Sequence, residues 1–201
     1  MTVREELLTH SQLIDLIESA TPAMGMSTSI VAIDGCGGAG KSTFAALLSA
    51  LLGDCPIVHT DDFASSEVPL NWYPRLLEQV FEPLSNDERA RFQRYDWETS
   101  QLAEWREVPS HRFLIVEGVS AARREFRPFL AFSIFVETDR ETRLARGLVR
   151  DGKDAEHLWL DWMREEDEYL ARDDPIAYAD LVVSGNPASA HDSAIELVAL
   201  V

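Results

Sequence analysis

The stretch GCGGAGKS at residues 35–42 combines glycines, a lysine and a hydroxyl at spacings that fit two phosphate-binding patterns. One pattern is G-x-G-x-x-G, which sets the pyrophosphate of a dinucleotide against a tight turn. The other is G-x-x-x-x-G-K-S, a loop whose backbone N–H groups surround the phosphates of a nucleoside triphosphate. The first pattern predicts an oxidoreductase, and the second predicts a phosphoryl-transfer enzyme or an ATPase.

The pair Lys41-Ser42 separates the two interpretations. Asp61 follows at about the distance at which a dinucleotide site places its acidic residue, so that pattern has some support. A dinucleotide turn, however, gives no reason for a lysine followed by a hydroxyl, whereas a triphosphate uses the lysine on its β and γ oxygens and the hydroxyl on Mg²⁺. We therefore predict a loop that binds ATP with Mg²⁺, formed by Gly35, Gly37, Gly38, Ala39, Gly40, Lys41, Ser42 and Thr43.

Short apolar runs alternate with amphipathic segments along the chain, which is typical of a parallel sheet covered by helices. Buried strands are predicted at residues 29–35, 56–62, 112–118, 132–138 and 179–185. Helices are predicted from Leu7 to Ile17 and at residues 41–53, 139–150, 156–171 and 188–200. The predicted fold is a three-layer α/β fold with a five-stranded parallel sheet and helices on both faces.

The predicted strands end in polar or flexible residues, and three of these ends carry carboxylates: Asp61–Asp62, Glu117 and Glu137. Ligands of such sheets bind beyond the carboxyl ends of the strands. Glu117 is therefore a candidate to hold Mg²⁺ with Ser42, directly or through water, and the alternative is an acid that only faces solvent. An N-K-x-D guanine-reading segment and an hhhhDE run are both absent, which disfavours a GTPase and an ATPase motor.

Length and charge narrow the class of partner. The chain has 201 residues, and we expect residues 1–201 to form a single domain. A net charge of −17 disfavours nucleic acid and anionic membranes as partners and leaves a local site for a small anion. We expect a cytoplasmic protein, because the N-terminus does not resemble a secretion signal, no apolar stretch approaches a membrane span, and two cysteines make no disulfide framework.

These motifs, in this order, resemble the uridine kinase-like branch of the P-loop kinases. The resemblance extends over nearly the whole chain and is carried by GCGGAGKS, HTDDFA, RYDW, VEGV, RLARGLVRD and ADLVV. It implies a P-loop nucleoside triphosphate hydrolase-type fold in which Asp61 is the base that faces the acceptor hydroxyl. The alternative role for Asp61 is a partner of Mg²⁺ in the second coordination sphere.

The resemblance also implies an inserted acceptor-binding lobe at residues 64–111, which we expect to be helical. Within it, Asp96 corresponds to a residue that grips ribose hydroxyls and Tyr95 to an aromatic that stacks on a base, with Trp97 adjacent. The alternative is that Tyr95 and Trp97 are core anchors of the lobe. The stretch between residues 65 and 92 matches no substrate-specific segment.

A mobile arginine lid is expected at about residues 140–157. Arg143, Arg146 and Arg150 are spaced three and four residues apart and so share one helix face. The resemblance implies that Arg146 and Arg150 act on the transferring phosphate, and the alternative is that Arg146 pairs with nearby acids.

The sequence thus predicts an ATP- and Mg²⁺-dependent kinase acting on a hydroxyl of a small molecule, a nucleoside or nucleoside-like compound. Two alternatives stay open. One is a kinase of another small hydroxyl substrate, such as a sugar acid, pantothenate or a shikimate-like compound. The other is a regulatory nucleotide-binding protein without catalysis.

Overall fold

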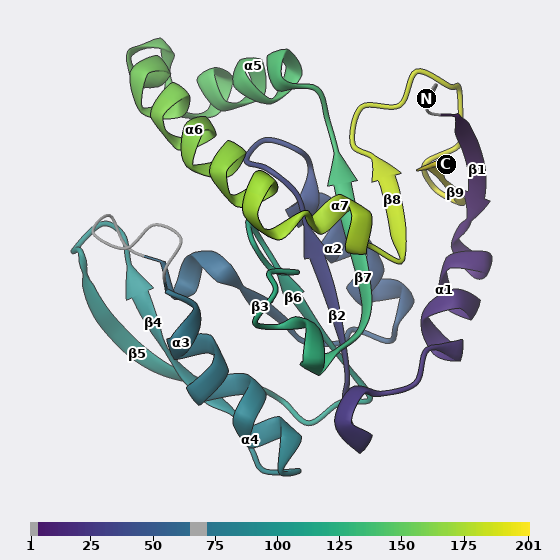
Figure 1. Ribbon diagram of the computed structural model, residues 1–201, viewed down its shortest axis with the longest axis vertical. Helices are drawn as coiled ribbons and strands as arrows, with labels where there is room; N and C mark the ends of the chain where they lie inside the picture. The colour runs from purple at the N-terminus through teal and green to yellow at the C-terminus, as the bar shows by residue number, and fades with distance from the viewer. Residues whose placement is uncertain (1–3, 65–71) are drawn as a thin grey trace.

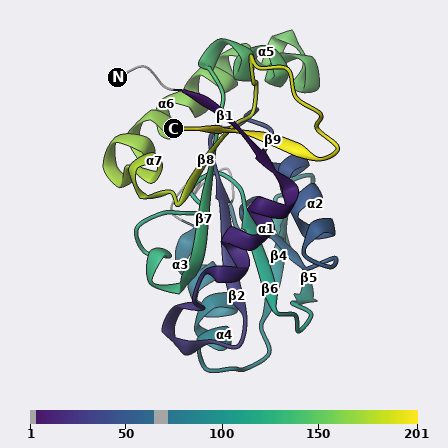
Figure 2. The same cartoon turned by 90° about the vertical axis from the view of Figure 1, so that its right-hand side faces the viewer.

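A seven-stranded sheet forms the centre of the computed structural model, which describes residues 4–64 and 72–201 (Figures 1 and 2). Within these residues the strand order is β1-β9-β8-β7-β2-β6-β3. The strands are β1 (Glu5–Thr9), β2 (Ser29–Asp34), β3 (Ile57–His59), β6 (Phe113–Glu117), β7 (Leu130–Glu137), β8 (Leu181–Ser184) and β9 (Glu196–Leu200). The five strands from β8 to β3 are parallel, so the predicted parallel sheet is confirmed.

Helices cover both faces of this sheet, as the alternation of side chains along β2 requires. Val31 and Ile33 pack in one core with Leu13 of α1 and Leu48 of α2. Ile30 and Ala32 belong to a second core on the opposite face. The helices outside the 64–111 segment are α1 (His10–Ser19), α2 (Lys41–Leu51), α5 (Arg140–Asp151), α6 (Glu156–Asp173) and α7 (Pro175–Tyr178). No helix in the described ranges is long and apolar enough to cross a membrane.

The predicted lobe at residues 64–111 is only partly helical, and its residues 65–71 lie outside the described part of the chain. A helical segment contains α3 (Tyr73–Leu76), a π-helical stretch (Leu77–Phe81) and α4 (Glu82–Ser85). It is followed by an antiparallel hairpin of β4 (Arg91–Asp96) and β5 (Gln101–Glu107). The helical segment packs against the sheet, whereas the hairpin stands at the side of the molecule (Figure 1).

The helix predicted from Leu7 to Ile17 is confirmed from His10 onward, and the helix predicted at residues 188–200 is wrong. Residues 5–9 form β1, and α1 begins only at His10, because Thr9 caps it by accepting a hydrogen bond from the backbone N–H of Gln12. Residues 196–200 of the predicted last helix form β9, which pairs antiparallel with β1 (Figure 2). The two ends therefore extend the sheet beyond β8.

Candidate functional site

The glycine loop runs from the end of β2 to the start of α2 and lies tightly against its neighbours. At Gly38 the backbone adopts φ +77°, and a Cβ there would lie 2.7 Å from the carbonyl oxygen of Arg143. At Gly35 a Cβ would lie 2.5 Å from the carbonyl oxygen of Val136, in the neighbouring strand. The loop then delivers Lys41, Ser42 and Thr43 at the N-terminus of α2, where free N–H groups and the helix dipole favour a bound anion.

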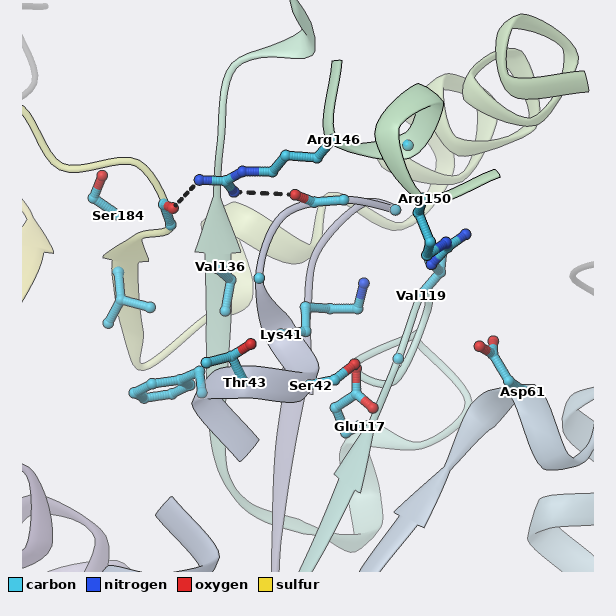
Figure 3. A pocket seen from close by; sticks show the side chains of 18 of the residues that line it. Lys41, Ser42, Thr43, Asp61, Glu117, Val119, Val136, Arg146, Arg150 and Ser184 are labelled. Atoms are coloured by element: carbon cyan, nitrogen blue, oxygen red, sulfur yellow. Dashed lines mark hydrogen bonds between the residues drawn. The ribbon is translucent and has the colours of Figure 1, made fainter. Parts of the chain in front are cut away.

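Lys41 is 7% exposed and lies over the loop, where its Nζ donates a hydrogen bond of 3.0 Å to the carbonyl oxygen of Cys36. Other loop carbonyls also accept from side chains: Ala39 accepts from Thr138 Oγ1 at 3.0 Å. Side-chain hydrogen bonds thus fix the loop at several carbonyl oxygens. The Lys41 ammonium is a cation that points into the cavity (Figure 3).

Ser42 and Glu117 lie together although they come from different elements. Ser42 Oγ donates to Glu117 Oε1 at 3.1 Å, and Glu117 is at the end of β6, beside β2. Burial alone would raise the pKa of Glu117, but the hydrogen bonds from His59 and Ser42 and the charge of Lys41 outweigh it and lower this pKa. Glu117 is therefore a carboxylate at neutral pH, next to a hydroxyl.

His59, at the end of β3, is a residue of this site that the sequence analysis missed. Its Nδ1 lies 2.7 Å from Glu117 Oε2, and this hydrogen bond raises the pKa of His59 against the effect of desolvation. The contact orients the Glu117 carboxylate toward Ser42. The HTDDFA motif includes His59 but gives it no role, because the pairing of β3 with β6 creates the contact.

Asp61 follows β3 and faces the same space as Lys41 and Arg150 (Figure 3). Its side chain is exposed into the cavity, but the surrounding protein excludes much of its water, and this desolvation raises its pKa despite the nearby Lys41 charge. Its backbone carbonyl oxygen accepts a hydrogen bond of 3.0 Å from Trp97 Nε1.

These side chains line one large cavity of about 1500 Å³. One part is polar and contains Lys41, Asp61 and Glu117, and Trp97 borders it. The cavity continues past the glycine loop to a second part between α2, the end of β8 and β9. The predicted nucleotide-binding residues Gly37, Gly38, Gly40, Lys41, Ser42 and Thr43 line it, whereas Gly35 and Ala39 are buried behind the loop surface.

The three arginines of α5 separate into different environments. Arg143 is buried in an ion pair with Glu166 at 2.8 Å. Arg146 lines the cavity and donates to the carbonyl oxygens of Gly38 at 3.1 Å and Gly185 at 3.0 Å (Figure 3). Arg150 also lines the cavity and pairs with Asp151 at 2.8 Å. The alternative that Arg146 pairs with acids is not what this structure shows, because its guanidinium bridges two backbone segments.

The three residues predicted to bind the acceptor differ in whether they line the cavity. Trp97 lines the cavity, but Tyr95 and Asp96 are not in its described lining. The carboxylate of Asp96 accepts from the backbone N–H groups of Glu98 and Thr99, at 2.9 and 3.1 Å, and from Arg94 Nη2 at 3.1 Å. Contact of Tyr95 and Asp96 with an acceptor therefore stays a prediction. Tyr95 packs edge-on against Trp97, with ring centroids 5.3 Å apart.

Comparisons with known proteins agree with this geometry. An AAA domain family matches residues 31–171, so the chain belongs to this family. The predicted P-loop α/β fold is thereby confirmed, and the resemblance to P-loop kinases is confirmed at the level of fold.

Two solved structures share that fold. A possible uridine kinase from Bacillus stearothermophilus is 23% identical with a TM-score of 0.63, over 86% of this chain and 96% of that one. A candidate fructose transport system kinase from Silicibacter sp. TM1040 is 19% identical with a TM-score of 0.55, over 85% of this chain and 92% of that one.

Proposed function

We propose that the protein transfers the γ-phosphoryl group of ATP, with Mg²⁺, to a hydroxyl of a small molecule, in the first place a nucleoside or nucleoside-like compound. The observation that carries this proposal is the meeting of Lys41, the Ser42–Glu117 pair and Asp61 in one cavity at the carboxyl ends of β2, β3 and β6. Phosphoryl transfer asks a protein mainly for positioning and charge neutralisation, plus a group that orients the nucleophile.

The donor side of the cavity suits a magnesium nucleotide. Mg²⁺ prefers oxygen ligands and is usually held by one or two protein groups together with phosphate oxygens and water. Ser42 Oγ and the Glu117 carboxylate, 3.1 Å apart, are such groups, and Glu117 reaches the ion directly or through water. Mg²⁺ would neutralise charge on the phosphates, and the Lys41 ammonium, which has three donors, would contact phosphate oxygens while it keeps its hydrogen bond to the Cys36 carbonyl oxygen.

On the acceptor side, Asp61 is the proposed general base. A carboxylate whose pKa is raised by desolvation accepts a proton more readily than an ordinary aspartate. The acceptor hydroxyl gives its proton to Asp61 while its oxygen attacks the phosphorus atom in line with the leaving ADP. Trp97, half exposed on the cavity wall, offers a flat apolar face to a planar ring of the acceptor.

A second candidate is a kinase of a different small hydroxyl compound, without a nucleobase and ribose. The observation that favours it is at Asp96, whose carboxylate already accepts hydrogen bonds from Arg94 and from two backbone N–H groups of its own hairpin turn. A carboxylate engaged in this way is poorly available to grip the vicinal diol of a ribose.

The test is a panel of nucleosides, sugars, sugar acids and pantothenate, each incubated with the protein, ATP and Mg²⁺ and assayed for ADP above the rate without acceptor. A nucleoside that is phosphorylated by the natural protein and not by Lys41→Ala supports the first candidate. Phosphorylation of a sugar or acid alone supports the second. ATP binding without turnover of any acceptor contradicts both and favours a regulatory nucleotide-binding protein.

A further inference from the structure

The peptide bond between Cys36 and Gly37, at the apex of the loop, is held at both ends by charged side chains. Its carbonyl oxygen accepts from Lys41 Nζ at 3.0 Å, and its N–H donates to Glu166 Oε1 at 2.6 Å. A peptide unit is planar and rigid, so the two contacts set the orientation of one plane. Glu166 belongs to α6, which is 129 residues away from Gly37 in the sequence.

Glu166 has no exposed surface, and within residues 4–64 and 72–201 its charge is balanced by one ion pair, with Arg143. Its second oxygen, Oε2, accepts from Arg143 Nη1 at 2.8 Å, and Arg143 Nε donates to the carbonyl oxygen of Thr138 at 3.1 Å. A buried carboxylate without such a partner would be costly and would repel the phosphates of a nucleotide. With Arg143, the pair presents an oriented acceptor to Gly37 without a net charge.

Trp159 of α6 closes the remaining side of this contact. A Cβ on Gly37 would lie 3.1 Å from the Trp159 ring and 3.2 Å from Glu166 Oε1, so a side chain would push the loop away from α6. The same ring also lies close to Gly147, where a Cβ would lie 2.2 Å from Trp159. The two glycines thus allow α6 to approach the loop closely enough for the Glu166–Gly37 hydrogen bond.

We infer that Glu166 is a positioning residue for the donor nucleotide. It acts through the Cys36–Gly37 peptide, which it holds so that the Cys36 carbonyl keeps the Lys41 ammonium at the mouth of the loop. It does not contact the phosphates itself, because its two oxygens are used by Gly37 and Arg143. The inference rests on the proposed function, since it assigns the loop to nucleotide phosphates.

The geometry predicts different outcomes for three substitutions at this position. Glu166→Ala removes the acceptor of the Gly37 N–H. Glu166→Asp keeps a charge for Arg143 but shortens the reach to Gly37 by one methylene. Glu166→Gln keeps an oxygen for Gly37, but it turns a donating NH2 group toward Arg143 and leaves that buried guanidinium without its ion pair. Glu165→Ala, on the exposed side of the same helix turn, is the matched control.

Two measurements test the inference. One is calorimetric titration with Mg²⁺–ATP, and the other is steady-state kinetics with the acceptor that the panel of candidate substrates identifies. We expect Glu166→Ala and Glu166→Asp to raise Kd and KM for ATP about tenfold with the acceptor KM unchanged, because the loop binds only the donor. We expect Glu166→Gln to lower the folding stability, because Arg143 loses its partner, but to leave the ATP Kd and KM of the folded protein within about threefold of the natural values. Glu165→Ala should match the natural protein in both. The amide proton resonance of Gly37 should move upfield in the Ala and Asp variants only.

Several results would overturn the inference. One is a Kd for Mg²⁺–ATP in Glu166→Ala or Glu166→Asp that equals that of the natural protein. Another is an equal rise of this Kd in Glu166→Gln and Glu166→Asp, which would assign the role to the charge of Glu166 and not to its hydrogen bond with Gly37. If Glu166→Ala does not fold, the comparison of Gln with Asp decides. Absence of ATP binding by the natural protein would instead overturn the proposed function, and this inference with it.

Discussion

The glycine loop and the β4–β5 hairpin border the same cavity but are built in opposite ways. Gly35, Cys36 and Ala39 of the loop are buried, and side chains from other elements hold the loop: Ala39 is 1% exposed and accepts a hydrogen bond from Thr138. The hairpin carries large apolar side chains in solvent, with Trp97 and Trp105 each 50% exposed, and its main ion pairs, around Arg94, lie within the hairpin. In terms of the proposed function, the donor side is preformed, and we expect the final contacts of the acceptor side to depend on the substrate.

The largest effect should come from the residue between the two regions. Asp61→Asn removes the proposed base, and we expect kcat to fall about 10³-fold while Kd for Mg²⁺–ATP stays unchanged, as general-base catalysis contributes in that range. Asp62→Asn is the matched control, because Asp62 faces Arg106 at 3.7 Å and not the cavity. Equal rates for Asp61→Asn and the natural protein would remove Asp61 from the mechanism.

The donor side makes a prediction about the metal. Ser42→Ala removes one proposed oxygen ligand and the partner of Glu117. We expect the Mg²⁺ concentration for half-maximal rate to rise about tenfold or more, in line with the usual cost of altering a metal site. A magnesium titration of the initial rate measures this, and an unchanged midpoint would contradict the assignment of Ser42.

The acceptor side is tested by a pair of adjacent substitutions. Trp97→Ala removes the aromatic face on the cavity wall, and we expect the acceptor KM to rise about tenfold if a base stacks on it. Asp96→Asn should have a smaller effect, because its carboxylate serves the hairpin turn. KM values for acceptor and ATP decide the comparison. A larger loss for Asp96→Asn than for Trp97→Ala would mean that the hairpin rearranges to grip a diol.

Arg146 connects the loop to the end of β8 through two carbonyl oxygens, Gly38 and Gly185. Each such hydrogen bond contributes about 1 kcal/mol or less at an exposed position, so Arg146→Ala should raise the ATP KM about fivefold. Arg140 is on the same helix as Arg146 and forms an exposed ion pair with Asp167 of α6, so Arg140→Ala should leave the ATP KM unchanged. A drop in kcat alone would point instead to direct action of Arg146 on the phosphate in transit.

The smallest effect concerns pH. Desolvation raises the pKa of Asp61, so its carboxylate is lost at a higher pH than an ordinary aspartate as the solution is acidified. We expect the acidic limb of the kcat/KM profile, which reports groups of the free protein, to fall at correspondingly higher pH. A carbon NMR titration of the Asp61 carboxyl in the free protein checks the origin of the limb, and an ordinary aspartate midpoint would contradict it.

Local signals in the sequence were sufficient for the parallel sheet and the loop. β2 contains the apolar run from Ile30 to Ile33 and ends directly before the first glycine of the loop. Lys41 and Ser42 directly follow the last glycine, so the strand and the phosphate-binding residues lie in one short stretch. The capping pattern of Thr9 and Gln12 also marks the start of α1, although the apolar Leu7 and Leu8 fit the helix period as well.

Local sequence signals did not predict the contacts between segments that are distant in the sequence. β1 and β9 are strands because they pair with each other across the whole length of the chain, and short apolar runs alone do not distinguish that from a helix. The same holds for His59 on Glu117 and for Glu166 on Gly37, since each contact depends on strand order or helix packing. The sequence by itself determined that the chain carries a P-loop, because one contiguous stretch contains it. Tertiary structure alone decided which side chains hold that loop and which ones line the cavity beside it.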